Sequence, residues 1–88
     1  MSKRELSWTQ EAWKSYIYWQ SQDRKTLKRI NKLIEATLCE PFDGIGKPEP
    51  LKENLSGFYS RRIDETNRLV YAVEENRIVI ISCRYHYG

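Results

Sequence analysis

With 88 residues, the chain is long enough for one domain, residues 1–88, and too short for a second. A hydrophobic share of 40% and a charged share of 31% exclude a disordered chain, and the absence of a ~20-residue apolar run or a signal-peptide core predicts a cytoplasmic protein without a membrane anchor. The net charge of +3 is too small to identify a nucleic-acid partner, but ten of the fifteen lysines and arginines fall within 24–32 and 61–84.

The first forty residues predict a short strand followed by two helices. Leu6 and Trp8 alternate with polar residues, as in a strand. Thr9 is a good helix N-cap, and the apolar residues that follow at helical spacing are Ala12, Trp13, Tyr16, Ile17 and Trp19. Asp23 is placed to cap a second helix that ends near Pro41. The apolar stripe of this second helix consists of Leu27, Ile30, Leu33, Ile34 and Leu38.

Beyond a loop at 41–50 that is rich in proline and glycine, the pattern changes to that of β-strands. Residues 58–63, 69–73 and 77–87 form three runs rich in β-branched and aromatic residues, with hairpin loops predicted at 64–67 and 74–76. Residues 78–81 are apolar on both faces, which is typical of a central strand. Two N-terminal helices packed on a small antiparallel sheet make an α+β domain.

His86 is the only histidine and the first candidate for chemistry. Strand alternation places Ser82, Arg84 and His86 on one face, and an imidazole beside an arginine suits phosphate-ester chemistry, in which a leaving oxygen takes up a proton. The alternative is a solvated chain end. Because neither a second histidine nor a Cys-x-x-Cys pair accompanies it, we expect no metal and no other cofactor, and Cys39 and Cys83 are expected to be free thiols.

Glu49 is the second candidate, because a proline on each side favours an extended backbone and Lys47 and Lys52 flank the segment. Such a carboxylate could abstract a proton while the lysines bind phosphate, or the segment could be an ordinary stiff surface loop. The remaining candidates are the arginines around the first hairpin, Arg61, Arg62 and Arg68, and the aromatic residues beside the histidine, Tyr85 and Tyr87. These features do not choose between a nuclease and an RNA-binding module, since arginines also guard sheet edges.

Four segments, in order, resemble the signature of the YoeB toxins of the RelE superfamily. They are Gly46–Lys52, Asn54–Ile63, Arg68–Val73 and Cys83–Tyr87, and the pattern from Trp13 to Gln20 is also similar. Four ordered motifs with matching spacing make a specific signal that covers nearly the whole chain. The resemblance implies a RelE-like microbial ribonuclease architecture and a single toxin domain. The chain departs from the family pattern in a few extra N-terminal residues and in Gly88, which follows the usual terminal tyrosine.

The resemblance implies a ribosome-dependent mRNA endonuclease, the toxin of a type II toxin–antitoxin pair, which cuts mRNA in the ribosomal A site by metal-independent transesterification. By position in the motifs, Glu49 would be the general base, His86 the general acid and Arg68 the group that stabilises charge on the phosphate. The other implied site residues are Tyr87, which would shape the site or stack in it, and the RNA-binding residues Lys52, Arg61 and Arg62.

The implied partners are a YefM-like antitoxin, the ribosome with its mRNA, a second copy of the chain, and operator DNA through the antitoxin complex only. Two alternatives stay open: a non-catalytic module that binds the ribosome or the antitoxin, and a RelE-fold toxin with another target, such as gyrase. The set of Glu49, Arg68 and His86 favours the endonuclease, because pure binding needs no acid–base pair.

The length of the loop at 74–76 decides whether Arg68 and His86 can act on one phosphate. With a three-residue loop, Arg68 faces Ser82 and shares a face with His86. With a two-residue turn, Arg68 faces Cys83 and points away. A shared site therefore predicts the three-residue loop, although two-residue turns are the commoner connection and a β-bulge would also restore the pairing.

Overall fold

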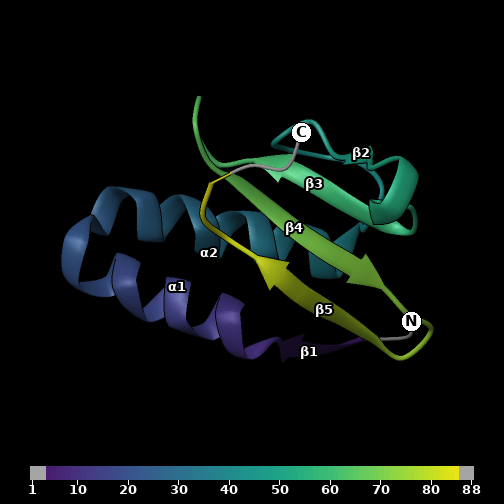
Figure 1. The fold of residues 1–88 in the computed structure, drawn as a ribbon, viewed down its shortest axis with the longest axis horizontal. Coiled ribbons are helices and arrows are strands. Elements are labelled where there is room, and N and C mark those ends of the chain that lie inside the picture. Colours follow the sequence, from purple (N-terminus) through teal and green to yellow (C-terminus); the bar gives the residue numbers. More distant parts are fainter. Residues whose placement is uncertain (1–3, 86–88) are drawn as a thin grey trace.

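The computed structural model of the chain describes residues 4–85 as two helices and a five-stranded sheet (Figure 1). In chain order the elements are β1 (Glu5–Trp8), α1 (Gln10–Gln22), α2 (Arg24–Cys39), β2 (Glu49–Pro50), a 3-10 turn (Glu53–Leu55), β3 (Phe58–Arg62), β4 (Arg68–Val73) and β5 (Arg77–Ser82). The strand order across the sheet is β1-β5-β4-β3-β2, and both helices lie on one face of it. The predicted α+β class is confirmed.

The two predicted helix caps are present. The Thr9 hydroxyl accepts the Ala12 N–H at 3.0 Å, and it also donates to the Ile81 carbonyl at 3.1 Å, which joins the start of α1 to β5. The Asp23 carboxylate accepts the first free N–H groups of α2, those of Lys25 and Thr26, at 3.1 and 3.2 Å. Both caps satisfy donors that a helix leaves unpaired at its N-terminus, so they fix where each helix begins.

The core lies between the helices and the sheet. Its most buried members are Ile30 and Leu33 from α2, Ala12 from α1, and a group from the central strands, Leu69, Tyr71, Ile78 and Ile80. The apolar stripe predicted for the second helix supplies the α2 side of this core. Tyr71 places its ring in the core and donates its hydroxyl to the Pro41 carbonyl at 2.7 Å. Burial raises the pKa of this phenol above its usual value.

The sheet differs from the predicted one at both edges and at the end of β5. The edge strand β1 pairs with β5 in parallel, so the sheet is mixed. Strands β3, β4 and β5 pair antiparallel as expected, and β2, which lies within the predicted loop at 41–50, adds an antiparallel edge strand. The strand predicted at 77–87 ends at Ser82, and residues 83–85 form bends. Tyr85 has a φ of 65°, which an extended strand does not allow.

The hairpin between β4 and β5 corrects the predicted loop. The Glu74 N–H donates to the Arg77 carbonyl at 2.9 Å, so the connection is a two-residue turn and the three-residue loop is wrong. A β-bulge then changes the register, because Tyr71 pairs with Ile80 whereas Val70 pairs with Ser82, which leaves Ile81 as the extra residue.

The bulge reverses the faces beyond Ile81. Ile78 and Ile80 face the helices, whereas Ser82 shares the opposite face with Val70, so strict strand alternation does not hold from Ile78 to Ser82. Arg68, two residues before Val70, nevertheless lies on the same face as Ser82, as predicted. The bulge therefore restores the pairing that the two-residue turn would have broken. His86 lies outside the described residues.

Candidate functional site

The face of the sheet opposite the helices, called here the distal face, brings together three of the predicted site residues. Glu49 pairs with Ser60, and Arg62 pairs with Arg68, in the registers of β2–β3 and β3–β4. Paired residues share a face, and so do residues two apart on a strand. Glu49, Arg62 and Arg68 therefore project from the distal face. From the spacing of the strands and the rise per residue, the backbones of Glu49 and Arg68 are roughly 12 Å apart. Their long side chains can reach toward each other, so that their charged groups lie around one phosphate.

Glu49 and Lys52 belong to the segment on the far edge of the sheet. Glu49 lies in the two-residue strand β2, and Lys52 precedes the 3-10 turn. Both side chains are exposed, and the segment is joined to the sheet by hydrogen bonds such as that from the Leu51 N–H to the Phe58 carbonyl at 2.9 Å. The predicted extended, proline-flanked presentation of Glu49 is thus observed.

Arg68 is oriented by the turn that precedes it. Its Nη1 donates to the carbonyls of Asp64 and Asn67 at 2.9 and 3.3 Å, and its backbone N–H donates to the Tyr85 carbonyl at 2.8 Å. Arg68 therefore lies beside the segment that leads directly into His86. A guanidinium has five N–H donors, so Nη1 can hold the backbone while Nε and Nη2 bind a phosphate.

The turn at 64–67 is organised by one carboxylate. Asp64 Oδ1 accepts the backbone N–H groups of Thr66 and Asn67 at 2.8 and 2.7 Å, and both carboxylate oxygens accept Asn67 Nδ2 at 3.2 Å. Partial burial raises the pKa of Asp64, but these hydrogen bonds and the positive charge of Arg68 outweigh it and lower the pKa below its usual value. The carboxylate stays ionised and holds the turn.

The segment 83–85 is attached to α1 and to this turn. The Cys83 carbonyl accepts Trp19 Nε1 at 2.9 Å, and burial raises the pKa of the Cys83 thiol to about 12. The Arg84 guanidinium lies 3.6 Å from the centre of the Tyr18 ring and 4.7 Å from that of Tyr85.

Tyr85 combines exposure with a constrained backbone. It is 61% exposed and has a φ of 65°, a left-handed conformation that costs a non-glycine residue about 1–2 kcal/mol. Its N–H donates to Asn67 Oδ1 at 2.6 Å. Such conformations persist where neighbouring contacts impose them, and they cluster at functional sites. His86 and Tyr87, the predicted acid and the predicted stacking residue, follow Tyr85 in sequence and lie outside the described residues.

Arg61 does not have the predicted RNA-binding placement, because it is 0% exposed and on the helix side of the sheet. Its guanidinium donates to the carbonyls of Glu40, Asp43 and Ile45 at 2.6 to 2.9 Å and to the Tyr71 hydroxyl at 3.2 Å. A cation with these partners caps the C-terminal end of α2 and fixes the loop at 40–46. Arg61 is therefore a structural residue that anchors the loop leading to Glu49.

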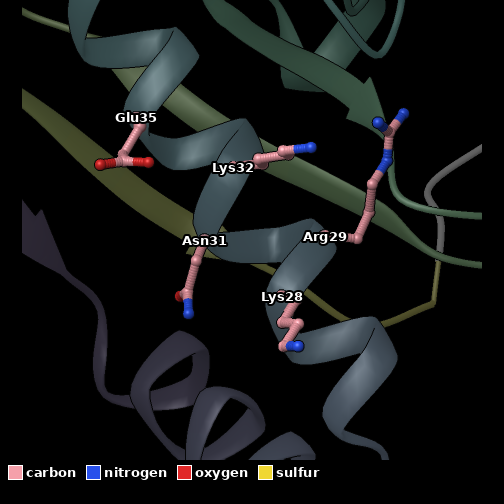
Figure 2. A pocket seen from close by; sticks show the side chains of 5 residues that line it. All are labelled: Lys28, Arg29, Asn31, Lys32 and Glu35. Carbon is pink, nitrogen blue, oxygen red and sulfur yellow. The ribbon is translucent and has the colours of Figure 1, made fainter.

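The cations of α2 form a surface beside this site. The basic face of α2, defined as Arg24, Lys25, Lys28, Arg29 and Lys32, lies away from the buried stripe. Lys28, Arg29 and Lys32 line a shallow hollow of about 440 Å³ together with Asn31 and Glu35, and Figure 2 shows Arg29 reaching from α2 toward the end of β3. Arg29 Nη2 donates to the Arg62 backbone carbonyl at 3.2 Å, which brings one cation of the basic face to the end of β3, at the border of the sheet.

Sequence reasoning missed Asp64, Asn67 and Tyr18 as parts of the site. An Asp-x-x-Asn turn indicated a hairpin, but its contact with Tyr85 joins residues 18 apart, which local patterns do not reveal. Within residues 4–85, three or more His, Cys, Asp or Glu side chains do not gather at any metal-sized site. In the same range, neither helix is long and apolar enough to cross a membrane.

The chain matches known proteins over nearly its whole length. Residues 8–87 match the model of the YoeB-like toxins of bacterial type II toxin–antitoxin systems. Toxin YoeB of Escherichia coli (strain K12) is 57% identical over 82 residues, which cover 93% of this chain and 98% of that protein. A Staphylococcus aureus YoeB dimer superposes with a TM-score of 0.90 at 45% identity, covering 98% of this chain and 100% of its own. The S. aureus YoeB–YefM complex gives 0.88 at 44% identity, with the same coverage.

The match and the geometry agree on the same segments. The matched residues include the β2 segment with Glu49, the β3–β4 hairpin with Arg62 and Arg68, and the residues up to Tyr87. The fold in which these segments meet is that of the solved relatives. The chain belongs to the YoeB-like toxins of bacterial type II toxin–antitoxin systems.

Proposed function

We propose that this toxin is an endonuclease that binds the ribosome, cuts mRNA in the A site and so inhibits translation. The observation that carries the proposal is the gathering of Glu49, Arg62 and Arg68 on the distal face, beside the segment that runs into His86. A carboxylate and two guanidiniums around one position suit a phosphodiester better than an uncharged substrate, because arginine binds phosphate in a bidentate manner.

The proposed reaction is a transesterification within the RNA. Glu49 takes the proton of a ribose 2′-hydroxyl, whose oxygen attacks the adjacent phosphorus. The bond from phosphorus to the 5′-oxygen breaks, and His86 gives that oxygen a proton, which leaves a 2′,3′-cyclic phosphate and a 5′-hydroxyl. Arg68 stabilises the extra negative charge on the phosphate as it forms. Every step uses side chains of this chain, and the step needs neither a metal ion nor a cofactor.

The open geometry explains why the ribosome belongs in the proposal. Glu49 and Lys52 are exposed on a short edge segment, so the free protein offers a shallow face rather than a closed pocket. Such a face can bring reacting groups together only if a second surface holds the RNA against it. The ribosome holds A-site mRNA in a fixed conformation and supplies that surface.

The basic face of α2 supports binding to ribosomal RNA. Its five cations lie on one helix, and Arg29 connects them to Arg62 at the edge of the distal face. Ribosomal phosphates contacted by this face would hold the protein from the helix side, while Lys52 would hold the mRNA near Glu49. Positive charge of this kind binds RNA backbones without reading their sequence.

The proposed protein partners are a YefM-like antitoxin and a second copy of the chain. The S. aureus relatives form a YoeB–YefM complex and a YoeB dimer. In this chain Trp13 and Ile17 are 48% and 46% exposed on α1, an apolar surface of the kind that protein interfaces bury. An antitoxin with acidic side chains would complement the distal-face arginines and block RNA, and operator DNA would be contacted through that antitoxin.

Primer extension on ribosome-bound mRNA tests the proposal. Wild-type protein should produce discrete new ends within A-site codons, and Glu49→Gln and Arg68→Ala should each abolish most of them. Lys14→Ala, which removes an exposed cation from α1, is the matched control and should cut like the wild type. Translation that stops while the mRNA stays intact would contradict the endonuclease and indicate the non-catalytic module.

A further inference from the structure

One turn contacts both halves of the proposed site. Through its carbonyls, the turn at 64–67 holds the Arg68 guanidinium, and through the Asn67 side chain it holds Tyr85, the residue before His86. The Asn67 Oδ1 to Tyr85 N distance is 2.6 Å, and the Arg68 N–H donates to the Tyr85 carbonyl at 2.8 Å. Both backbone polar groups of Tyr85 are thus bound by two adjacent residues.

We propose that Asn67 is a positioning residue for the cleavage reaction, which sets the segment leading to His86 relative to the Arg68 guanidinium. The inference rests on the proposed endonuclease function. His86 follows Tyr85 in sequence, so the hydrogen bond from Tyr85 to Asn67 fixes the residue through which the proposed acid is attached. Proton transfer to a leaving oxygen requires the acid to be placed to within a fraction of an ångström. Residues 83–85 lie beyond β5, so contacts other than strand pairing must fix their position.

The contact uses both polar groups of the asparagine amide. Asn67 uses its oxygen as an acceptor for Tyr85 and its amide as a donor to both carboxylate oxygens of Asp64. A side-chain amide offers a donor and an acceptor in one plane, so a single residue can bind both partners. Asn67 is 8% exposed, so water competes little for either hydrogen bond. Asp64 therefore orients Asn67, and Asn67 orients Tyr85.

Three variants separate positioning from general stability. Asn67→Ala removes both hydrogen bonds of the side chain. Asn67→Asp keeps an oxygen for the Tyr85 N–H but places a second carboxylate against Asp64. The exchange variant, Asp64→Asn with Asn67→Asp, keeps acceptors for the Tyr85 N–H and for the backbone N–H groups of the turn, and it restores a donor–acceptor pair between the two side chains, because the amide and the carboxylate have changed places. Thr66→Ala is the matched control, since Thr66 contributes only its backbone N–H to the turn.

Single-turnover cleavage of ribosome-bound mRNA provides the main readout, with rates corrected for the folded fraction seen by circular dichroism. We expect both single variants to lower the rate constant at saturating protein by about 10- to 100-fold, because a misplacement of about 1 Å can cost ~100-fold. The concentration of half-saturation should not change, since the buried Asn67 offers little surface for a contact with the ribosome. The exchange variant should recover most of the rate, and Thr66→Ala should match the wild type.

Amide exchange of Tyr85, followed by NMR on the free protein, gives a second readout that does not depend on cleavage. The Tyr85 N–H should exchange slowly in the wild type and the exchange variant, and fast in Asn67→Ala. Full cleavage by Asn67→Ala, a changed half-saturation in place of a lower rate, or an exchange variant without recovery would each overturn the positioning role. Wild-type protein that leaves ribosome-bound mRNA intact would instead contradict the proposed function itself, whatever the amide exchange shows.

Discussion

Arg68 reaches the distal face with its guanidinium already oriented by the carbonyls of Asp64 and Asn67. A guanidinium held in advance loses little side-chain entropy when it binds a phosphate, and its planar donors match two phosphate oxygens at once. At the scale of single residues, this orientation distinguishes a group that stabilises a transition state from a cation that only attracts RNA.

Arg68→Lys tests that orientation, because lysine keeps the charge and loses the planar pair of donors. We expect the single-turnover rate on ribosome-bound mRNA to fall by about 10²–10³, the usual cost of removing one donor that stabilises developing charge. The concentration of half-saturation should change little. A lysine variant as fast as the wild type would reduce the role of Arg68 to charge alone.

His86→Ala tests the proposed general acid. Acid–base groups contribute about 10²–10⁴ in rate, so cleavage should fall by that factor while ribosome binding, measured by co-sedimentation, stays intact. The separation of cleavage from binding is the informative result. Near-wild-type cleavage by His86→Ala would remove the histidine from the mechanism.

The adjacent pair Arg61 and Arg62 should respond in opposite ways to substitution by alanine. Arg61→Ala leaves the carbonyls of Glu40, Asp43 and Ile45 without their donor, so we expect the free energy of unfolding to fall by about 3 kcal/mol or more in urea titrations. Arg62→Ala should change stability by less than ~0.5 kcal/mol, because the side chain is exposed, but should lower cleavage. Equal effects on stability would contradict the two placements.

At the scale of helices and strands, the sequence predicted the features that depend on residues close together in the chain. The caps at Thr9 and Asp23 and the buried stripe of α2 follow from side chains within four residues of one another, and all three are present. The parallel pairing of β1 with β5, the short strand β2 and the bulge at Ile81 depend on partners far away in sequence. Sequence periodicity carries no information on those partners.

The same distinction explains the outcome for the site. Glu49, Arg62 and Arg68 come from motifs that the family resemblance indicates, and β-sheet register brings them to one face. Arg61 has the same residue type and nearly the same position as Arg62, yet alternation turns it into the core. Residue type alone could not distinguish the buried Arg61 from the exposed Arg62, because only the strand register shows which face of the sheet each side chain occupies.

Deletion of Ile81 tests whether this residue is the extra residue of the bulge. Without it β5 becomes regular, Ile80 and Ser82 still pair with Tyr71 and Val70, and Cys83 should keep its place in the core. In the wild type, alkylation under native conditions should modify the exposed Cys39 and spare Cys83, whose raised pKa and burial keep it an unreactive thiol. Mass spectrometry of the deletion variant should show the same pattern, with Cys39 modified and Cys83 spared.

Ile81→Val is the matched control for that deletion, because it keeps the bulge and removes one methylene. It should leave Cys83 protected and cost about 0.5–1.5 kcal/mol at most. A deletion variant in which Cys83 becomes reactive would show that Ile81 is not the extra residue and that the faces beyond it have changed.

At the scale of the whole molecule, the basic face of α2 should determine much of the RNA affinity. Arg29 brings one of its cations to the end of β3, where it contacts the Arg62 carbonyl. Affinity for ribosomes should fall steeply with salt, with a logarithmic slope of roughly −0.7 for each single-strand phosphate contacted. Replacing Lys28 and Lys32 by glutamine should lower that slope, whereas Lys14→Gln should not. A slope unaffected by any of these changes would mean that the cations of α2 only face solvent.

The central claim is that the protein cuts mRNA by transesterification only when the ribosome presents it. The most direct measurement is the chemical nature of the new ends, determined by mass spectrometry after single-turnover reactions with mRNA either free or bound in the A site. We expect a 2′,3′-cyclic phosphate and a 5′-hydroxyl on ribosome-bound mRNA, no cleavage at a position that carries a 2′-deoxyribose, and little cleavage of free mRNA. Intact ribosome-bound mRNA, or ends that form without the 2′-hydroxyl, would contradict it.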